Sequence, residues 1–566
     1  MRLTWSGEPQ IPRLVQDVEF SSEGGCELSF NFIKNQLSNC VQNHRPCRSY
    51  QDEMRKVLGG GWPRRILKIN NRGSKIKLVE FQPAMEQKYV ALSYCWGDQR
   101  KQFRAIASTL PALRKGVKVS QLPVTIKDAI KVSISLGIDL IWIDAMCIIQ
   151  DDRADWKTEA LKMATVYSNS LVTVIASEAK SCDQGFLSNK RNHSVVLGEV
   201  QVESKPVVIR GRVLRDWGHH RNGPQSPENY QHQCLDPVDT RGWILQERLL
   251  SSRYISFTSG EIQWGCQDCK VCECDQPLQQ DLASTGSSDD QWFATVDEFS
   301  MRHLSERTDV LIALAGIAKR ASTMLDGNWT WYAAGLWLEP QMSPLGARSL
   351  LWYRWSNLGP AYFPRVYTAP SFSWASVAGQ VQTAGQIDAE GGDFPTAVVE
   401  VDMIRSTPDM FGHVEGGHMR LCGPLISSKL SLRVPGGVPD SQAKIDVMEP
   451  ECLYVTTCFL DGPVERVSHP EGGFTVQRYR SENLEDSEKV RGEVHFDHAD
   501  VFILPITADS RDLMKPGQMK ESASGGALVL ARAVSGQGYE RIGMAQYTCS
   551  KLADLKSMSS SDIDLY

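Results

Sequence analysis

Residues 89–177 alternate short apolar runs with stretches whose apolar residues recur at helical spacing. The apolar runs leave no polar face, so they predict strands that are buried on both sides of a sheet. These runs span residues 89–94, 140–149 and 171–177. Strands of this kind, separated by single helices, indicate an α/β fold with a parallel sheet covered on both faces.

Two helices are expected between these strands. Pro123 opens the first helix, and Gly137 supplies its C-terminal stop. Asp152 or Asp155 caps the second helix, in which residues 156–167 carry one continuous apolar stripe.

The length of the chain requires several domains, since 566 residues exceed the roughly 250–300 that a single hydrophobic core supports. A stretch rich in Ser, Gln and Asp at 276–291 is the best linker, and mainly β patterns begin near residue 375. The expected parts are an N-terminal extension packing on the α/β domain (1–85), the α/β domain with insertions (86–275), a linker with a helical aromatic-rich segment (276–375) and a β-rich C-terminal region (376–566).

Charge and hydropathy exclude several classes of protein. A net charge of −6 without a basic stripe gives no support to nucleic-acid binding. The longest apolar runs, of about ten residues, are too short to span a membrane as a helix. The N-terminus lacks secretory features, and fifteen cysteines, an odd number, favour free thiols, so we expect a cytoplasmic protein.

Acidic residues interrupt apolar sequence in three blocks, at residues 89–98, 140–167 and 241–251. Burying an unpaired carboxylate costs several kcal/mol, so such an acid has either a structural partner or a chemical role. Parallel sheets bind ligands beyond the carboxyl ends of their strands, and the first two blocks contain such ends. The blocks are therefore where a functional site is expected.

Glu247 is the first candidate for a chemical role. Helical geometry places it on one face with Trp243 and Leu250. A carboxylate held against an aromatic wall suits general acid/base work or the stabilisation of a cationic transition state. The alternative is a salt bridge to Arg241, Arg253 or another arginine.

Other candidates also have structural alternatives. Glu159 repeats the pattern of Glu247, or it serves helix-start electrostatics and a buried ion pair. Asp144 ends a strand, where it can bind a ribose hydroxyl or a cation, or cap the following turn. Ser93 and Trp96 follow the first strand, and Trp96 can either stack on a base or plug the end of the sheet.

Cysteines form two groups. Cys266, Cys269, Cys272 and Cys274 give the pattern C-x2-C-x2-C-x-C, and Cys40, His44 and Cys47 lie near the N-terminus. Four ligands within nine residues close a tetrahedral zinc site only with strain, so we assign no metal to the chain. The motifs of Rossmann dehydrogenases, P-loop ATPases, serine hydrolases and zinc proteases are absent from the sequence.

The blocks resemble the HET domain of fungal heterokaryon incompatibility proteins. The resemblance rests on YVALSYCWGD, LPVTIKDAI, LGIDLIWIDAMCIIQDD, DWKTEALKMATVYSNS and DTRGWILQERLLSSR, in the order of the family. It covers residues 89–274 specifically, and the upstream cysteines and APSFSWAS at 369–376 look like the surroundings of the domain. The resemblance implies non-self recognition (allorecognition) and programmed cell death with the HET domain as effector.

HET domains are distantly similar to TIR domains, which implies a flavodoxin/TIR-like parallel sheet. Some TIR domains cleave the nicotinamide–ribose bond of NAD with a glutamate on a helix that begins with Trp. Trp243, Leu245, Glu247 and Leu249 resemble the W-x-L-x-E-x-L of that helix, which makes Glu247 the candidate catalyst and Glu159 the alternative acid. The chain departs from the TIR pattern in having some 60 residues between Ser177 and this helix.

On this resemblance NAD is a substrate, and no resident cofactor is expected. Glu247 would stabilise an oxocarbenium-like transition state. Trp96 or Trp243 would stack on a ring, Ser93 and Asp144 would hold ribose hydroxyls, and a phosphate would be bound by Arg241 or Arg248.

Three functional hypotheses follow. The first is a HET-type incompatibility and cell-death effector, with NAD cleavage as its activity. The second is a non-catalytic interaction module that acts through assembly, and the third is a metabolic enzyme that uses a recruited HET scaffold. The expected partners are further copies of the chain or an incompatibility partner protein, with no nucleic acid and no membrane span.

Overall fold

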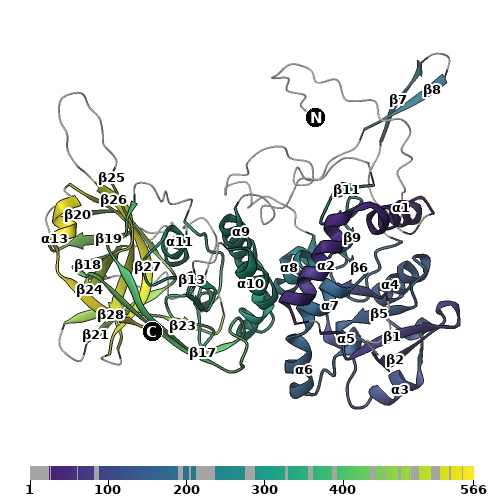
Figure 1. The fold of residues 1–566 in the computed structure, drawn as a ribbon, viewed down its shortest axis with the longest axis horizontal. Helices are drawn as coiled ribbons and strands as arrows, with labels where there is room; N and C mark the ends of the chain where they lie inside the picture. The colour runs from purple at the N-terminus through teal and green to yellow at the C-terminus, as the bar shows by residue number, and fades with distance from the viewer. Residues whose placement is uncertain are drawn as a thin grey trace.

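The computed structural model describes residues 25–566, except 26, 60, 82–87, 189–194, 203–204, 212–235, 274–286, 326–328, 355–360, 385–391, 434–441, 450–452, 470–472, 484, 486–495, 511–522, 535–536 and 551. An N-terminal mixed sheet with helices is followed by a helical segment and then by a large, mainly β C-terminal sheet. The helical segment lies between the two sheets (Figure 1). This arrangement confirms the expected α/β fold class with a β-rich C-terminal region.

The N-terminal sheet has a parallel centre. Strand β3 pairs in parallel with β5 on one side and β6 on the other, and β6 pairs in parallel with β9. The bounds are β3 Val90–Ser93, β5 Leu140–Ile143, β6 Val172–Ile175 and β9 Arg253–Phe257. Every residue of β3, β5 and β6 is buried, which explains why these strands show no polar alternation in the sequence.

Antiparallel strands that were not predicted from the sequence extend the sheet at both edges. The sheet contains nine strands among the described residues, in the order β11-β10-β9-β6-β3-β5-β1-β2-β4. The added strands are β1 Arg65–Asn70, β2 Lys75–Glu80, β4 Val117–Lys118, β10 Ile262–Cys266 and β11 Lys270–Cys272. The N-terminal segment thus contributes strands to this sheet as well as helices.

Helices connect and flank these strands. Their bounds are α1 Glu27–Asn43, α2 Arg45–Val57, α3 Leu110–Lys115, α4 Val124–Ser135, α5 Asp144–Cys147, α6 Arg153–Ala160, α7 Met163–Asn169 and α8 Gly242–Leu249. Helix α4 follows Pro123, and Gly137 lies beyond its end with φ of 73°. Asp152 caps α6 by accepting hydrogen bonds from the backbone N–H groups of Ala154 and Asp155. These local predictions are confirmed.

Two expected elements differ from the prediction. The strand expected over 140–149 ends at Ile143, because Asp144 begins the short helix α5. The single helix expected over 156–167 is divided into α6 and α7 between Ala160 and Met163. Both runs are apolar because they are buried, and apolarity alone does not distinguish a strand from a buried helical turn.

The insertion before α8 contains a hairpin. Strands β7 Val195–Val202 and β8 Lys205–Gly211 pair antiparallel. Most of the expected linker, and Cys274, lie outside the described residues.

The central segment contains α9 Ser288–Ser300, α10 Ile312–Met324, α11 Pro344–Leu350 and the hairpin β12 Trp331–Ala333 and β13 Leu336–Leu338. Helix α10 contacts α2, α7, α8 and α9. The central segment therefore packs directly on the helices that follow the N-terminal sheet.

The C-terminal sheet has thirteen strands in the described part of the chain, with the main path β16-β17-β28-β27-β26-β24-β18-β19. These strands are β16 Ala397–Arg405, β17 Val414–Pro424, β28 Ser560–Leu565, β27 Tyr539–Cys549, β26 Ala523–Arg532, β24 Phe496–Pro505, β18 Ile426–Arg433 and β19 Gln442–Val447. Off this path lie β15 Gly392–Asp393, β20 Leu453–Leu460, β21 Val464–Ser468, β22 Phe474–Arg478 and β25 Ala508–Ser510. Strands β14 Phe363–Pro364 and β23 Arg480–Ser481 form a separate parallel pair, and α13 spans Leu552–Ser557.

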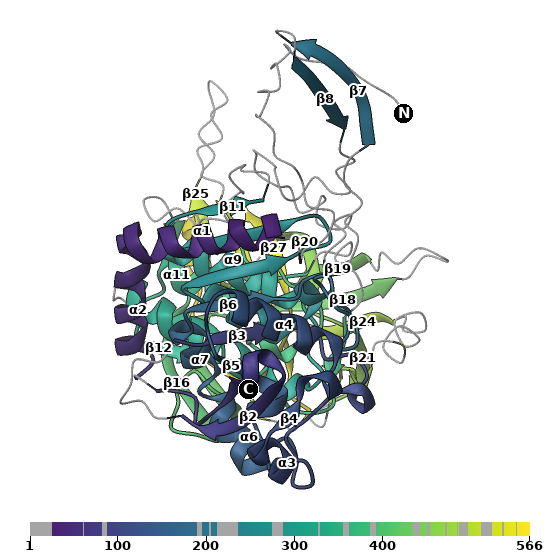
Figure 2. The same cartoon turned by 90° about the vertical axis from the view of Figure 1, so that its right-hand side faces the viewer.

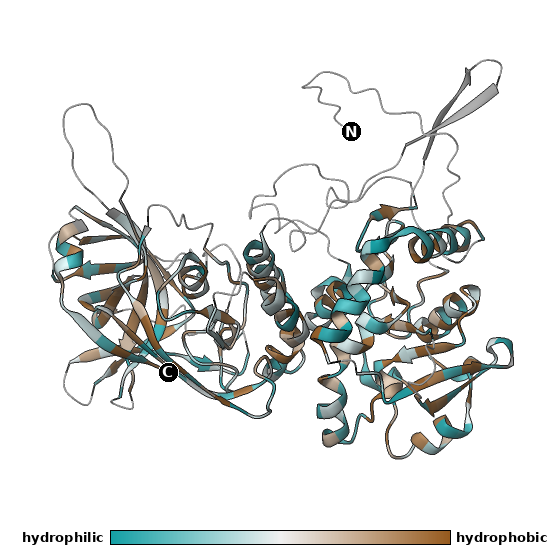
Figure 3. Cartoon of the chain, viewed as in Figure 1, coloured by the Kyte–Doolittle hydropathy of each residue, from teal (hydrophilic) through white to brown (hydrophobic). Residues whose placement is uncertain are grey.

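Buried apolar residues form separate clusters, one of which extends from the N-terminal helices into the C-terminal sheet. One apolar cluster runs from Tyr50 in α2 through α8, α9 and α10 to Leu565 in the last strand. A second fills the N-terminal sheet, and a third lies within the C-terminal sheet. Figure 3 shows brown, hydrophobic residues in the strands of both sheets and in the helices. No helix among the described residues is long and apolar enough to cross a membrane.

Candidate functional site

The parallel strands bring polar residues together at their carboxyl ends. Ser93 is the last residue of β3, and Asp144 directly follows β5. Since β3 and β5 are parallel neighbours, the two side chains belong to the same edge of the sheet. Residues 241–249 reach this edge from another part of the chain: the guanidinium of Arg241 donates a hydrogen bond of 2.9 Å to the carbonyl of Tyr94.

Glu247, on α8, is buried near the carboxyl ends of these strands and is 5% exposed. Burial, and after it the nearby charge of Asp144, raises the pKa of its carboxyl to about 7. The hydroxyl of Ser93, the charge of Arg241 and the hydroxyl of Tyr167 act in the opposite direction. We call Ser93, Asp144, Tyr167 and Glu247 the acid cluster.

Asp144 is the more accessible of the two acids, being only partly buried. Its carboxylate accepts hydrogen bonds from the indole N–H of Trp96 at 2.8 Å and the backbone N–H of Ala145 at 2.6 Å. Burial raises the pKa of Asp144 to about 6, although these hydrogen bonds and Arg241 favour the charged form. Trp96 therefore orients Asp144.

The arrangement has hydroxyl groups beside an acid that resists ionisation. Ser93 is 1% exposed, and its hydroxyl makes no hydrogen bond of standard geometry to the rest of the described chain. In the described part of the chain no Lys or Arg forms an ion pair with Glu247; its closest positive influence, Arg241, acts at longer range. The salt bridge that was the structural alternative for Glu247 is thus not formed with a described residue.

Trp243 and Arg248, also proposed to bind substrate, are engaged elsewhere. The indole N–H of Trp243 donates to Asp309 at 3.3 Å. Arg248 forms an ion pair of 2.6 Å with Glu298 in α9. Both contacts join α8 to the central segment. The helical projection used to place residues on faces of α8 could not predict them, because the partners are at least 50 residues away in the sequence.

Glu159, the alternative acid, has structural partners. It is 2% exposed and pairs with the ammonium group of Lys162 at 2.8 Å. Its second oxygen accepts a hydrogen bond from the backbone N–H of Arg64 at 3.4 Å. These contacts leave Glu159 apart from the acid cluster.

Tyr167 was missed by the sequence analysis as a member of the site. It was assigned to the apolar stripe of a helix, and its ring is indeed 1% exposed. Its hydroxyl nevertheless donates to the carbonyl of Leu92 at 3.1 Å, beside Ser93 and Glu247. A tyrosine in an apolar stripe needs a hydrogen-bond partner for its buried hydroxyl. That requirement was the feature of the sequence that could have indicated a polar site near Tyr167.

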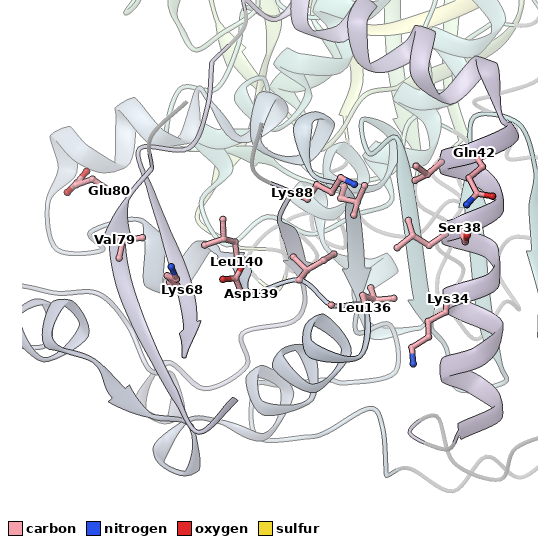
Figure 4. A pocket seen from close by; sticks show the side chains of 15 residues that line it. Lys34, Ser38, Gln42, Lys68, Val79, Glu80, Lys88, Leu136, Asp139 and Leu140 are labelled. Atoms are coloured by element: carbon pink, nitrogen blue, oxygen red, sulfur yellow. The ribbon is translucent and has the colours of Figure 1, made fainter. Parts of the chain in front are cut away.

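An open pocket of about 830 Å³ lies at the opposite ends of the parallel strands from the acid cluster (Figure 4). It is lined by Lys88 before β3, residues 136–140 at the start of β5 and Leu171 before β6, together with Lys34 of α1 and Lys68 of β1. These are the amino ends of the strands, so this pocket does not open onto the acid cluster.

Cysteines from both sequence groups gather at the edge of the sheet that carries β10. Cys266 lies with Cys40, His44 and Cys47, whose ligand atoms are all within 4.8 Å of one another. Cys272, in contrast, is disulfide-bonded, so the expectation of free thiols is wrong for this residue. Ten other cysteines of the described chain form no disulfide bond.

These observations define an α/β domain with an acid cluster at the carboxyl edge of its parallel strands. Residues 89–247 match the family model described as Heterokaryon incompatibility protein (HET). The chain therefore carries a HET domain at residues 89–247, as the sequence motifs indicated. Comparisons with curated proteins and with solved structures found no match.

Proposed function

We propose that this HET-domain protein is a cell-death effector of fungal heterokaryon incompatibility, and that its acid cluster cleaves the nicotinamide–ribose bond of NAD. The observation that carries the proposal is the position of Glu247, buried beside Ser93 and Tyr167 with Asp144 close by. Groups with strongly shifted pKa values at the carboxyl edge of a parallel sheet are typical of functional sites.

The reaction is a hydrolysis. Water adds to the anomeric carbon of the ribose and loses a proton to solvent, while the carbon–nitrogen bond breaks and nicotinamide leaves with its electron pair. The transition state has oxocarbenium character, which the ionised carboxylate of Glu247 stabilises. Because this role needs the charged form, a pKa of about 7 leaves Glu247 substantially ionised near neutral pH.

The remaining assignments follow the positions of the side chains. Ser93 and Asp144 hold ribose hydroxyls, and Trp96, which is partly exposed beside Asp144, stacks on a ring. Arg241 is partly exposed at the same edge and binds phosphate. Trp243 and Arg248 do not enter the proposal, because their contacts hold them against Asp309 and Glu298.

The burial of Glu247 and Ser93 makes the activity conditional. With 5% and 1% exposure these side chains are not reached by a dinucleotide in the structure described. We therefore expect cleavage only after a rearrangement that opens the edge of the sheet, driven by self-association or by an incompatibility partner.

The test is to incubate the purified full chain with NAD, with and without forced clustering, and to measure nicotinamide release by chromatography. Glu247→Gln should reduce release at least about 100-fold, because it keeps the size of the side chain and removes its charge. The matched control is Glu80→Gln, the same change at a glutamate on β2 whose side chain is 58% exposed, and it should retain the activity.

Activity that persists in Glu247→Gln would refute the catalytic assignment. Absence of release in every assembled state would favour the second hypothesis, a non-catalytic module that acts by assembly. The observation that favours this second hypothesis is that the acid cluster is enclosed, whereas the open pocket of about 830 Å³ lies at the amino ends of the strands.

A further inference from the structure

Three cysteines and a histidine meet where the N-terminal helices contact the edge of the sheet. Cys40 is in the last turn of α1, Cys47 is in the first turn of α2, and His44 lies between the helices. Cys266 ends β10, more than 200 residues later in the chain. Figure 2 shows α1 lying along the β11 edge of the sheet, above the other strands.

The spacing of the ligand atoms fits one tetrahedral ion. All four lie within 4.8 Å of one another, and His44 Nδ1 is 3.4 Å from Cys266 Sγ. Zinc bonds of about 2.3 Å to sulfur and 2.0–2.1 Å to nitrogen at tetrahedral angles place sulfur and nitrogen ligands about 3.5 Å apart. Two chain segments supply the ligands, so the strain expected for the cysteine motif by itself does not arise.

Groups around the four residues can orient a metal-binding histidine and stabilise a thiolate. His44 directs Nδ1 toward Cys266, while its other nitrogen is 3.4 Å from the carboxylate of Asp268. A carboxylate on the second nitrogen fixes the orientation of a metal-binding histidine. The backbone N–H of Cys269 donates a hydrogen bond to Cys266 Sγ at 3.4 Å, and such a hydrogen bond stabilises the thiolate form of a cysteine.

Arg253 provides an independent indication of negative charge at this place. It is 2% exposed, and its guanidinium donates to Cys40 Sγ at 3.0 Å. Among the described residues it has no carboxylate partner in an ion pair, although a buried guanidinium is costly without a counter-charge. A zinc ion with three thiolates and a neutral imidazole carries one negative charge, which supplies that partner.

We propose that Cys40, His44, Cys47 and Cys266 bind one structural Zn²⁺. Three sulfur ligands and one nitrogen ligand, all from the protein, are the composition of a closed structural zinc site. The cysteine ligands are at most 7% exposed, so no position is open to a substrate. The ion ties α1 and α2 to β10 and so holds the N-terminal helices on the N-terminal sheet, independently of any activity at the acid cluster.

The test is the zinc content of the purified full chain, prepared without a metal-affinity step and with thiols kept reduced. We expect about one zinc per chain by mass spectrometry. Cys40→Ser and Cys266→Ser should each lower this to less than about a tenth, because an alcohol is a poor replacement for a thiolate ligand.

Two control variants distinguish the ligands from other thiols. Cys269→Ser should keep its zinc: its sulfur is 3.8 Å from that of Cys266, but it is not one of the four mutually close ligands. Cys458→Ser, in β20 of the C-terminal sheet, should also keep it. Loss of zinc from Cys269→Ser would overturn this ligand set.

A measurement on the unmodified chain covers the case in which the variants fail to fold. Replacement of zinc by Co²⁺ should produce thiolate-to-cobalt charge transfer and the visible bands of a tetrahedral ion. A folded wild-type chain that contains no zinc and gives no such spectrum with Co²⁺ would refute the proposal. So would wild-type zinc content in a folded Cys266→Ser variant.

Discussion

Glu247 illustrates how a single residue can be stabilised in one protonation state and needed in another. Its pKa rises from 4.5 to about 7, mainly because burial disfavours the carboxylate. The folded state thus holds a proton on Glu247 that the unfolded state loses at lower pH. An acid kept in this way destabilises the protein at neutral pH, as functional residues commonly do.

The dependence of stability on pH tests this conclusion. Because the folded pKa is raised, the free energy of unfolding should fall as pH increases from about 4.5 to about 7, by roughly 3 kcal/mol for this group. Glu247→Gln has no such titration, so it should melt at a higher temperature than the wild type at pH 8 and lose that advantage near pH 5. Melting curves of the two proteins across this range provide the measurement, and a constant difference between them would contradict the assigned pKa.

At the scale of elements, α8 is held between the N-terminal sheet and the central segment. Glu247 faces the acid cluster, whereas Gln246 accepts a hydrogen bond of 2.8 Å from the backbone N–H of Gly316 in α10. A Cβ at Gly316 would lie 2.4 Å from Cβ of Ala164 in α7 and 2.7 Å from Leu250. Glycine therefore allows α10 to approach both α7 and the end of α8.

Gly316→Ala should destabilise the protein by roughly 1–3 kcal/mol, because the clash exceeds the gain of about 1 kcal/mol in helix propensity. The matched control is Gly346→Ala in α11, where the nearest atom to the new Cβ is the flexible Met342 sulfur at 3.3 Å. That variant should change stability by less than about 1 kcal/mol. Chemical denaturation of both variants makes the comparison, and equal effects would show that this contact between helices is unimportant.

At the scale of the whole molecule, a buried ion-pair network joins the central segment to the C-terminal sheet. Asp461 and Arg541 are both 0% exposed and form two contacts, of 2.9 and 3.2 Å. Arg541 also donates to the carbonyl groups of Leu350 and Trp352. Arg478 lies 3.6 Å from Asp461 and binds residues of the 369–376 motif, so this motif has a structural role here.

Asp461→Asn should destabilise the protein by about 3–5 kcal/mol, since it leaves two buried guanidinium groups without a carboxylate. Asp446→Asn is the control, because Asp446 is 48% exposed and, among the described residues, forms an ion pair only with Lys444; its effect should be below about 1 kcal/mol. Guanidinium unfolding measures both. A wild-type midpoint for Asp461→Asn would show that the network does not stabilise the junction.

Local patterns in the sequence predicted the local structure of the HET domain. Complete burial of β3, β5 and β6 requires continuous apolar runs, and Asp152 caps α6 through its own neighbouring backbone. The strand expected beyond Ile143 was wrong because a buried helical turn is equally apolar. Strands β1 and β2 were not predicted, since lysines interrupt their apolar residues and they lack the continuous apolar runs of the parallel strands.

The sequence by itself determined the HET domain and the residues to which chemistry could be assigned, because motifs and periodicity are properties of neighbouring residues. Only the tertiary structure decided their partners. It placed Glu247 beside Ser93 and Tyr167, turned Trp243 toward Asp309, and joined Cys266 to the N-terminal cysteines. Such contacts join residues that are far apart in the sequence and depend on how whole helices and strands pack. The spacing of residues along the sequence does not show which distant residues come together.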